Sequence, residues 1–103
     1  MSFGLQEQDI AYIAKAAGEF PEIEAVILFG SRAKGNFKKA SDIDLAIKGK
    51  SITTITVQRI SARLNEELPL PYFVDVLHYE SITNPDLIGH INRVGVVIYP
   101  VKP

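Results

Sequence analysis

The chain has 103 residues, which is enough for one domain around a single hydrophobic core, and one domain covering residues 1–103 is expected. A net charge of −1 supplies no general field for holding nucleic acid, and the absence of cysteine excludes disulfides and thiolate chemistry, so direct nucleic-acid binding and redox catalysis are not expected. The sequence has no basic leader and no apolar run of membrane-spanning length, so we expect a cytoplasmic protein without a membrane segment.

The first part of the chain predicts a helix followed by a buried strand. Apolar residues recur at helical spacing over Leu5–Gly18, and Pro21 ends the pattern. The segment Ile23–Phe29 is an almost continuous apolar run, which favours a strand that is buried on both faces. This run stops abruptly at Gly30, where the strand is expected to end.

A short polar segment and a second strand come next. We expect Ser31–Gly35 to form a turn of helix that Ser31 caps and Gly35 ends. The segment Ser41–Lys48 alternates polar and aliphatic side chains with the period of a strand. This alternation places Asp42 and Asp44 on one face of the predicted strand.

The connection between these two strands predicts how they pair. It is too short and too polar to carry a parallel crossover, which needs a dozen or more residues and usually a full helix. The strands are therefore expected to be antiparallel neighbours. In that arrangement the end of the first strand and the start of the second share one side of the sheet, which brings Gly30 and Ser31 close to Asp42 and Asp44.

The second half of the chain predicts two more helices and two more strands. Ile52–Leu68 begins with β-branched residues, but its apolar stripe and the prolines that follow favour a helix. Phe73–His78 is expected to form a strand, Asn84–Asp86 to start a helix, and Val94–Tyr99 to form the last strand. The predicted class is α+β with an α/β-like character: a small mixed β-sheet flanked by helices.

The residues at the end of the first strand suit a bound phosphate and a metal ion. Gly30 lets the backbone approach a phosphate closely, and the amides of the turn and Ser31 Oγ can donate to phosphate oxygens. Asp42 and Asp44 offer the hard oxygen ligands that magnesium prefers, and a cation would relieve their mutual repulsion. Asp75, in an otherwise apolar strand, suits a metal site or an acceptor hydroxyl that needs a base, or else pairs with a local Lys or Arg.

A basic cluster lies beside this turn and consists of Arg32, Lys34, Lys38 and Lys39. We expect Arg32 and Lys34 to contact a bound triphosphate, whereas the other loop lysines fit a solvated role better. His78 and His90 lie in no metal-ligand spacing, and we place both outside the mechanism.

The pattern Gly30-Ser31, ten residues, then Asp42-Ile43-Asp44 resembles the signature of the DNA polymerase beta-like nucleotidyltransferase superfamily. The fuller runs Leu28–Gly35 and Ser41–Leu45 look like its minimal, single-domain bacterial and archaeal branch (MNT-like). The resemblance covers most of the chain, including Asp75 as a later third carboxylate. One departure is Lys34, where the family often has Arg, because lysine keeps the charge but has no bidentate fork.

The resemblance implies a nucleotidyltransferase fold and a role for each motif residue. Gly30 and Ser31 would hold the triphosphate, and Asp42 and Asp44 would bind magnesium. Asp75 would complete the metal site and help deprotonate the acceptor. Two ions would serve the usual chemistry of such a site, one at the attacking oxygen and one at the leaving pyrophosphate.

Three functions follow as alternatives. The first is a magnesium-dependent nucleotidyltransferase that moves a nucleoside monophosphate, with AMP from ATP as the default, onto an acceptor. The second is a non-catalytic nucleotide-binding or regulatory subunit of a two-protein complex, and the third is an interaction protein that occupies a partner. Minimal members of the family are similar to the antitoxin half of toxin–antitoxin pairs, which implies a helical HEPN-type partner and a protein hydroxyl as acceptor. Acceptor, base preference and oligomeric state stay open.

Overall fold

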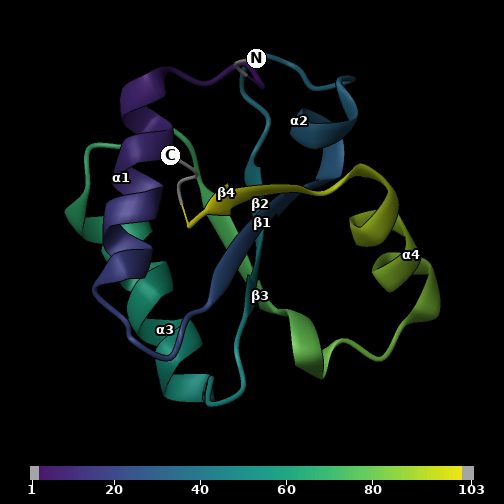
Figure 1. The fold of residues 1–103 in the computed structure, drawn as a ribbon. Coiled ribbons are helices and arrows are strands. Elements are labelled where there is room, and N and C mark those ends of the chain that lie inside the picture. The colour runs from purple at the N-terminus through teal and green to yellow at the C-terminus, as the bar shows by residue number, and fades with distance from the viewer. Residues whose placement is uncertain (1–2, 101–103) are drawn as a thin grey trace.

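A four-stranded mixed β-sheet forms the centre of the computed structural model, which describes residues 3–100 (Figure 1). The strands lie in the order β3-β2-β1-β4. Their bounds are Ala25–Phe29 for β1, Ile43–Lys48 for β2, Val74–His78 for β3 and Val96–Tyr99 for β4. β1 pairs antiparallel with β2 and with β4, whereas β2 and β3 are parallel. The predicted α+β class, the mixed sheet and the antiparallel first pair are confirmed.

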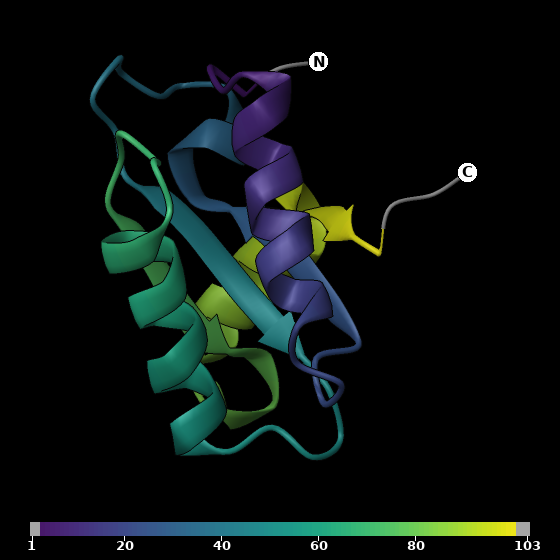
Figure 2. The same cartoon turned by 90° about the vertical axis from the view of Figure 1, so that its left-hand side faces the viewer.

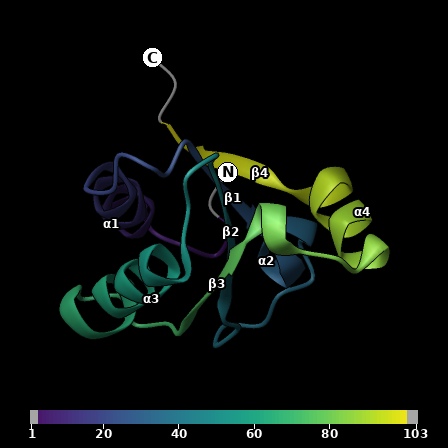
Figure 3. The same cartoon turned by 90° about the horizontal axis from the view of Figure 1, so that it is seen from below.

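Helices cover both faces of the sheet. The helices α1 (Glu7–Gly18) and α3 (Thr54–Ala62) lie side by side on one face, as Figure 2 shows with both in front of the strands. The helix α4 (Pro85–Val94) and the short α2 (Gly30–Lys34) lie on the other face (Figure 3). No helix within residues 3–100 is long and apolar enough to cross a membrane.

Each helical layer packs on its own apolar cluster. The larger cluster fills the space between the sheet and the α1 and α3 layer, and its fully buried members include Ile13, Leu28, Leu45, Ile60 and Leu64. The smaller cluster centres on Phe29, Ala46 and Ile91. Because alternate strand residues point to opposite faces, β1 and β2 contribute to both clusters.

The β-branched residues at the start of α3 are helical because threonine side chains cap the helix. Thr53 is the N-cap of α3, and its side chain accepts a hydrogen bond from the Thr56 amide at 3.3 Å. The helix runs on into η1, a π-helical turn over Arg63–Glu67. There the Asn65 side chain both donates to the Val74 carbonyl and accepts from the Val74 amide, at 2.8 Å each. This bond pair occupies part of the outer edge of β3.

The short helix α2 departs from the prediction at its start. It begins at Gly30, its N-cap is Phe29, and no side chain caps it. The expected capping role of Ser31 is therefore wrong, because Ser31 already lies inside the helical turn. Its end is as predicted: Gly35 has the left-handed φ of +96°, and its amide donates to the Ser31 carbonyl at 2.9 Å.

The strand directions give the sheet two distinct rims. At the first, which we call the Gly30 rim, β1 ends and β2, β3 and β4 begin. At the second, the Glu80 rim, β1 begins and the other three strands end. Phe29 is opposite Asp44 on β2, and Asp44 is in turn opposite Asp75 on β3, so the predicted aspartates gather at the Gly30 rim.

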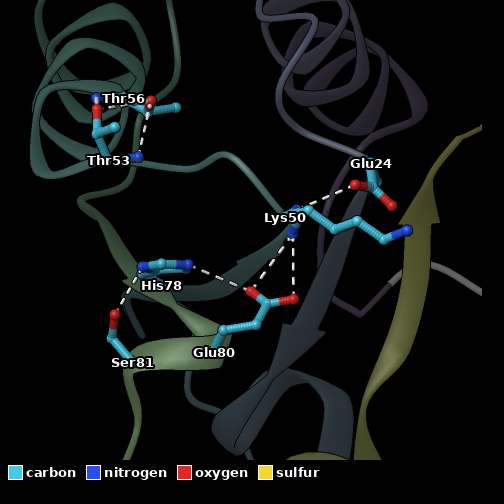
Figure 4. A network of polar contacts seen from close by, with 8 residues as sticks. Glu24, Lys50, Thr53, Thr56, His78, Glu80 and Ser81 are labelled. Carbon is cyan, nitrogen blue, oxygen red and sulfur yellow. Dashed lines mark hydrogen bonds and ion pairs between the residues drawn. The ribbon is translucent and has the colours of Figure 1, made fainter.

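Acidic side chains at the Glu80 rim accept backbone hydrogen bonds (Figure 4). Glu24 Oε2 accepts from the Lys50 amide at 3.0 Å, and both Glu80 oxygens accept from the Gly49 amide at 3.2 and 3.3 Å. His78 Nε2 lies 3.3 Å from Glu80 Oε1, and the Nδ1 atom of the same ring lies 2.7 Å from Ser81 Oγ. These contacts tie the loops that follow β2 and β3 to each other.

Candidate active site

The turn after β1 requires glycine at position 30. Gly30 has a φ of +75°, a conformation that residues with a Cβ rarely adopt. A Cβ built on Gly30 would also collide with the carboxylate of Asp44. The turn and the second aspartate of the predicted motif are therefore in direct juxtaposition, with the backbone of one against the side chain of the other.

Two of the predicted carboxylates are neighbours across the sheet. Asp44 on β2 is the register partner of Asp75 on β3, and paired residues of adjacent strands point to the same face. Asp44 is half-buried, whereas Asp75 is exposed because β3 is the edge strand at that end of the sheet. Asp42 lies just before β2 and is exposed.

The three carboxylates lack neutralising partners. Within residues 3–100, none of their side chains makes a hydrogen bond or an ion pair. Partial burial raises the pKa of Asp44 above its ordinary value, and the nearby charges of Asp75 and then Asp42 raise it further. His90 acts in the opposite direction and lowers the pKa of Asp44. The site thus concentrates negative charge, and no ion pair within residues 3–100 balances it.

The chemistry of these groups fits magnesium, which binds hard oxygen ligands and is attracted by unbalanced negative charge. No three carboxylate or imidazole groups within residues 3–100 converge closely enough to form a ligand set by themselves. The three predicted aspartates thus lie at one rim of the sheet, but their carboxylates do not converge on a common position.

The structure places Arg32 in a buried position with backbone partners, whereas the sequence predicts that it contacts the triphosphate. Its side chain is buried, with 1% exposure, and its guanidinium donates to the carbonyl of Ser41 at 2.7 and 3.1 Å and to that of Phe3 at 2.9 Å. The same group stacks over the rings of Tyr72, at 4.4 Å, and Phe37, at 5.2 Å. The reason is that the loop before β2 supplies carbonyls that accept from most of the N–H groups of the guanidinium.

The other two polar residues of the predicted turn are available. Lys34, the last residue of α2, is exposed and makes no ion pair within the described part of the chain. Ser31 is partly exposed, and its hydroxyl makes no hydrogen bond among residues 3–100. Ser31 Oγ and Lys34 Nζ are therefore side-chain donors beside Gly30 that have no partner within residues 3–100.

His90 lies beside the turn, although its sequence context places it outside the site. The backbone N–H of Gly30 donates a hydrogen bond to Nε2 of His90 at 3.1 Å, across 60 positions of sequence. The His90 ring also meets Phe29 edge to face, with 6.1 Å between ring centroids. No local spacing signals this contact, because it depends on how α4 packs on the sheet. His78 is at the opposite rim, as Figure 4 shows, and stays outside the site.

Comparisons with known proteins identify the family of the chain. The family model described as "Polymerase beta, Nucleotidyltransferase" matches residues 11–102. The probable protein adenylyltransferase MntA of Haemophilus influenzae is 31% identical over 94 residues, which span 91% of this chain and 82% of that protein.

Two solved structures have a similar fold. A toxin–antitoxin structure with AMP-PNP contains a chain that superimposes with a TM-score of 0.70 at 23% identity, over 92% of this chain and 73% of its own. A tri-AMPylated Shewanella oneidensis HEPN toxin in complex with an MNT antitoxin gives a TM-score of 0.69 at 21% identity, over 92% and 72%. Because the family model covers most of the sequence, the chain belongs to the polymerase beta nucleotidyltransferase family.

Proposed function

We propose that this protein is a magnesium-dependent protein adenylyltransferase that transfers AMP from ATP to a hydroxyl group of a helical, HEPN-type partner protein. The observation that carries the proposal is the Gly30 rim, where Asp42, Asp44 and Asp75 gather beside a glycine turn and form no ion pair with any residue in the range 3–100. The name of the H. influenzae relative and the AMPylated complex of similar fold support the choice of AMP and of a protein acceptor.

The turn binds the triphosphate in this proposal. Gly30 allows the phosphates to approach the backbone because it has no side chain, and Ser31 Oγ donates to a phosphate oxygen. Lys34 adds a mobile positive charge from the end of α2. Arg32 contributes indirectly, since it holds the loop carbonyls that shape the approach to Asp42.

The three carboxylates hold magnesium. Asp42 and Asp44 supply oxygen ligands from the start of β2, and Asp75 supplies another from the start of β3. When bound, two such ions supply Lewis acidity at the attacking and leaving oxygens of the transfer. The raised pKa of Asp44 is consistent with a group whose ionised form becomes favourable once a cation is present.

The transfer itself is an exchange of one phosphorus–oxygen bond for another. The acceptor hydroxyl oxygen forms a bond to the α-phosphorus of ATP, and the bond from that phosphorus to the bridging oxygen of the β-phosphate breaks, which releases pyrophosphate. Asp75 is exposed and, unlike Asp42 and Asp44, lies on an edge strand. It is therefore the carboxylate that an incoming acceptor reaches. Its oxygen accepts the proton that the hydroxyl loses.

The test is a transfer assay with the partner present. We would purify the chain together with a HEPN-type protein encoded beside it, add magnesium and ATP labelled in the α-phosphate, and follow the label into protein. The expected result is stable label on the partner, together with one pyrophosphate per label. Asp44→Asn is the inactive control, and Glu80→Gln at the opposite rim is the matched control that keeps transfer.

Other outcomes would decide between the alternatives. Binding of ATP without label transfer to any protein or small molecule would contradict the enzyme proposal and favour a non-catalytic nucleotide-binding subunit. Efficient transfer by the lone chain to a small molecule, unaffected by the partner, would keep the nucleotidyltransferase and reject the protein acceptor.

A further inference from the structure

His90 is the side chain that holds the phosphate turn from outside the motif. It comes from α4, which lies on the same face of the sheet as α2 (Figures 1 and 3). Its Nε2 atom accepts the hydrogen bond of the Gly30 amide at 3.1 Å. The Gly30 peptide is therefore anchored by a residue 60 positions away in the sequence.

One ring contact and the packing of α4 keep this imidazole in place. Its edge-to-face contact with Phe29, which is only 6% exposed, fixes the ring against the last residue of β1. The next residue along α4, Ile91, is buried in the same cluster as Phe29. The Asn84 side chain caps the helix by accepting from the Asp86 amide at 2.9 Å. The acceptor nitrogen is thus presented by a packed helix and not by a loop.

The anchored residue is the one with the most conformational freedom at the site. Glycine populates positive and negative φ about equally, so a free Gly30 peptide has several orientations open to it. At the observed φ of +75° the turn lies against Asp44, where even a Cβ would collide with the carboxylate. A hydrogen bond to the Gly30 amide removes the competing orientations before any ligand arrives.

We propose that His90 is a positioning residue of the nucleotide site, whose Nε2 holds the Gly30 amide and so preorganises the turn for a magnesium–nucleoside triphosphate. The proposal rests on the function proposed above, since it assigns the triphosphate to this turn. His90 acts through the backbone of Gly30 and need not touch the reacting atoms.

Two substitutions separate this role from simple packing. His90→Phe keeps a ring against Phe29 but has no acceptor for the Gly30 amide, whereas His90→Gln loses the ring but places an amide oxygen near the Nε2 position. Arg93→Gln, an exposed change on the same helix, controls for the charge of α4. The probe is magnesium with α,β-methylene ATP, which binds as ATP does but cannot release pyrophosphate.

The readouts are the dissociation constant of that probe by calorimetry and the exchange rate of the Gly30 amide proton by NMR without nucleotide. We expect His90→Phe to weaken binding by about five- to tenfold, the scale of one neutral hydrogen bond, and to speed exchange at Gly30. His90→Gln and Arg93→Gln should bind within about twofold of the wild type, because the acceptor is kept in both.

Three results would overturn the proposal. If the wild-type chain binds the probe and His90→Phe binds it equally well, the positioning role is rejected and the proposed function stands. Weaker binding by His90→Gln than by His90→Phe would show that the ring, and not its acceptor nitrogen, is what matters. If the wild-type chain bound no nucleotide, the proposed function would fail first, and the positioning role would fail with it.

Discussion

The Gly30 rim and the Glu80 rim carry acidic side chains in opposite circumstances. At the Glu80 rim, the carboxylates of Glu24 and Glu80 accept hydrogen bonds from the amides of Lys50 and Gly49. At the Gly30 rim, the side chains of Asp42, Asp44 and Asp75 accept no hydrogen bond and form no ion pair within residues 3–100. Both rims belong to one sheet and both lie at strand ends, so position in the fold does not explain the difference.

The difference shows what each set of acids does for the molecule. A carboxylate that accepts backbone amides stabilises a loop, because it satisfies donors that folding takes away from water. A group of carboxylates that face each other without partners costs folding free energy, and a chain tolerates that cost where the charges serve a ligand. The comparison therefore separates structural from functional acids without any appeal to the motif.

The largest expected effect tests that separation directly. Asp44→Asn or Asp75→Asn should lower AMP transfer by at least about a hundredfold, the scale of a lost electrostatic contact in a transition state. Glu80→Gln should keep transfer at the wild-type level, since it acts on a loop at the other rim. Initial rates with labelled ATP measure both. Substantial activity in Asp44→Asn would remove the functional meaning that we give to the Gly30 rim.

The second prediction concerns the two basic residues of α2. Arg32→Ala should lower the free energy of unfolding by about 3 kcal/mol or more, because it leaves the partly buried carbonyls of Phe3 and Ser41 without donors and opens a cavity under two aromatic rings. Lys34→Ala, at an exposed position, should change it by no more than about 0.5 kcal/mol and should weaken nucleotide binding instead. Urea unfolding and calorimetry distinguish the two. Equal stability of both variants would contradict the structural role of Arg32.

The third prediction uses two glycines with left-handed φ. Gly35→Ala should cost about 1–2 kcal/mol of stability, which is the strain of a Cβ in that conformation, and little else, since no atom lies within 4 Å of the added carbon. Gly30→Ala adds a collision with the Asp44 carboxylate, so it should cost more stability and also weaken nucleotide binding. Tight nucleotide binding by a folded Gly30→Ala protein would show that the turn is not the phosphate site.

The smallest effect is a pair of opposite pH dependences in the metal-free protein. Asp44 has a raised pKa in the folded state, so the folded protein holds that proton more tightly and stability falls as pH rises from about 4, the unfolded pKa, through the folded value. Glu22, near the Glu80 rim, has a lowered pKa from hydrogen bonds to its own backbone and to Thr56. Its contribution is present above about 4.3, the unfolded value, and is lost as pH falls.

Unfolding in urea between pH 3.5 and 7 reveals both slopes. The stability of the wild type relative to Asp44→Asn should decrease with rising pH, whereas its stability relative to Glu22→Gln should increase. Magnesium should weaken the pH dependence of the stability relative to Asp44→Asn, because a cation favours the ionised carboxylate of Asp44. It should leave the pH dependence relative to Glu22→Gln unchanged. Parallel slopes for the two variants would contradict the contrast between the rims.

The sequence by itself determined the elements and most of the site, for local reasons. Apolar periodicity, the prolines after Leu68 and the cap formed by Asn84 act within a few residues, so the helices and strands were predictable from them. The short link from Phe29 to Asp42 also left only an antiparallel pairing, and that pairing brings the Gly30 turn to the aspartates.

Only the tertiary structure decided the rest, because it depends on contacts between residues that are distant in the sequence. The position of Arg32 in the turn predicts a phosphate ligand, yet its guanidinium donates to the Phe3 carbonyl and stacks on the Tyr72 ring, and both residues are distant in the sequence. His90 has no local pattern at all, and its contact with Gly30 exists because α4 packs on the second face of the sheet. A side chain's neighbours in space, and not its neighbours in the sequence, set whether its charge or its lone pair is free to act.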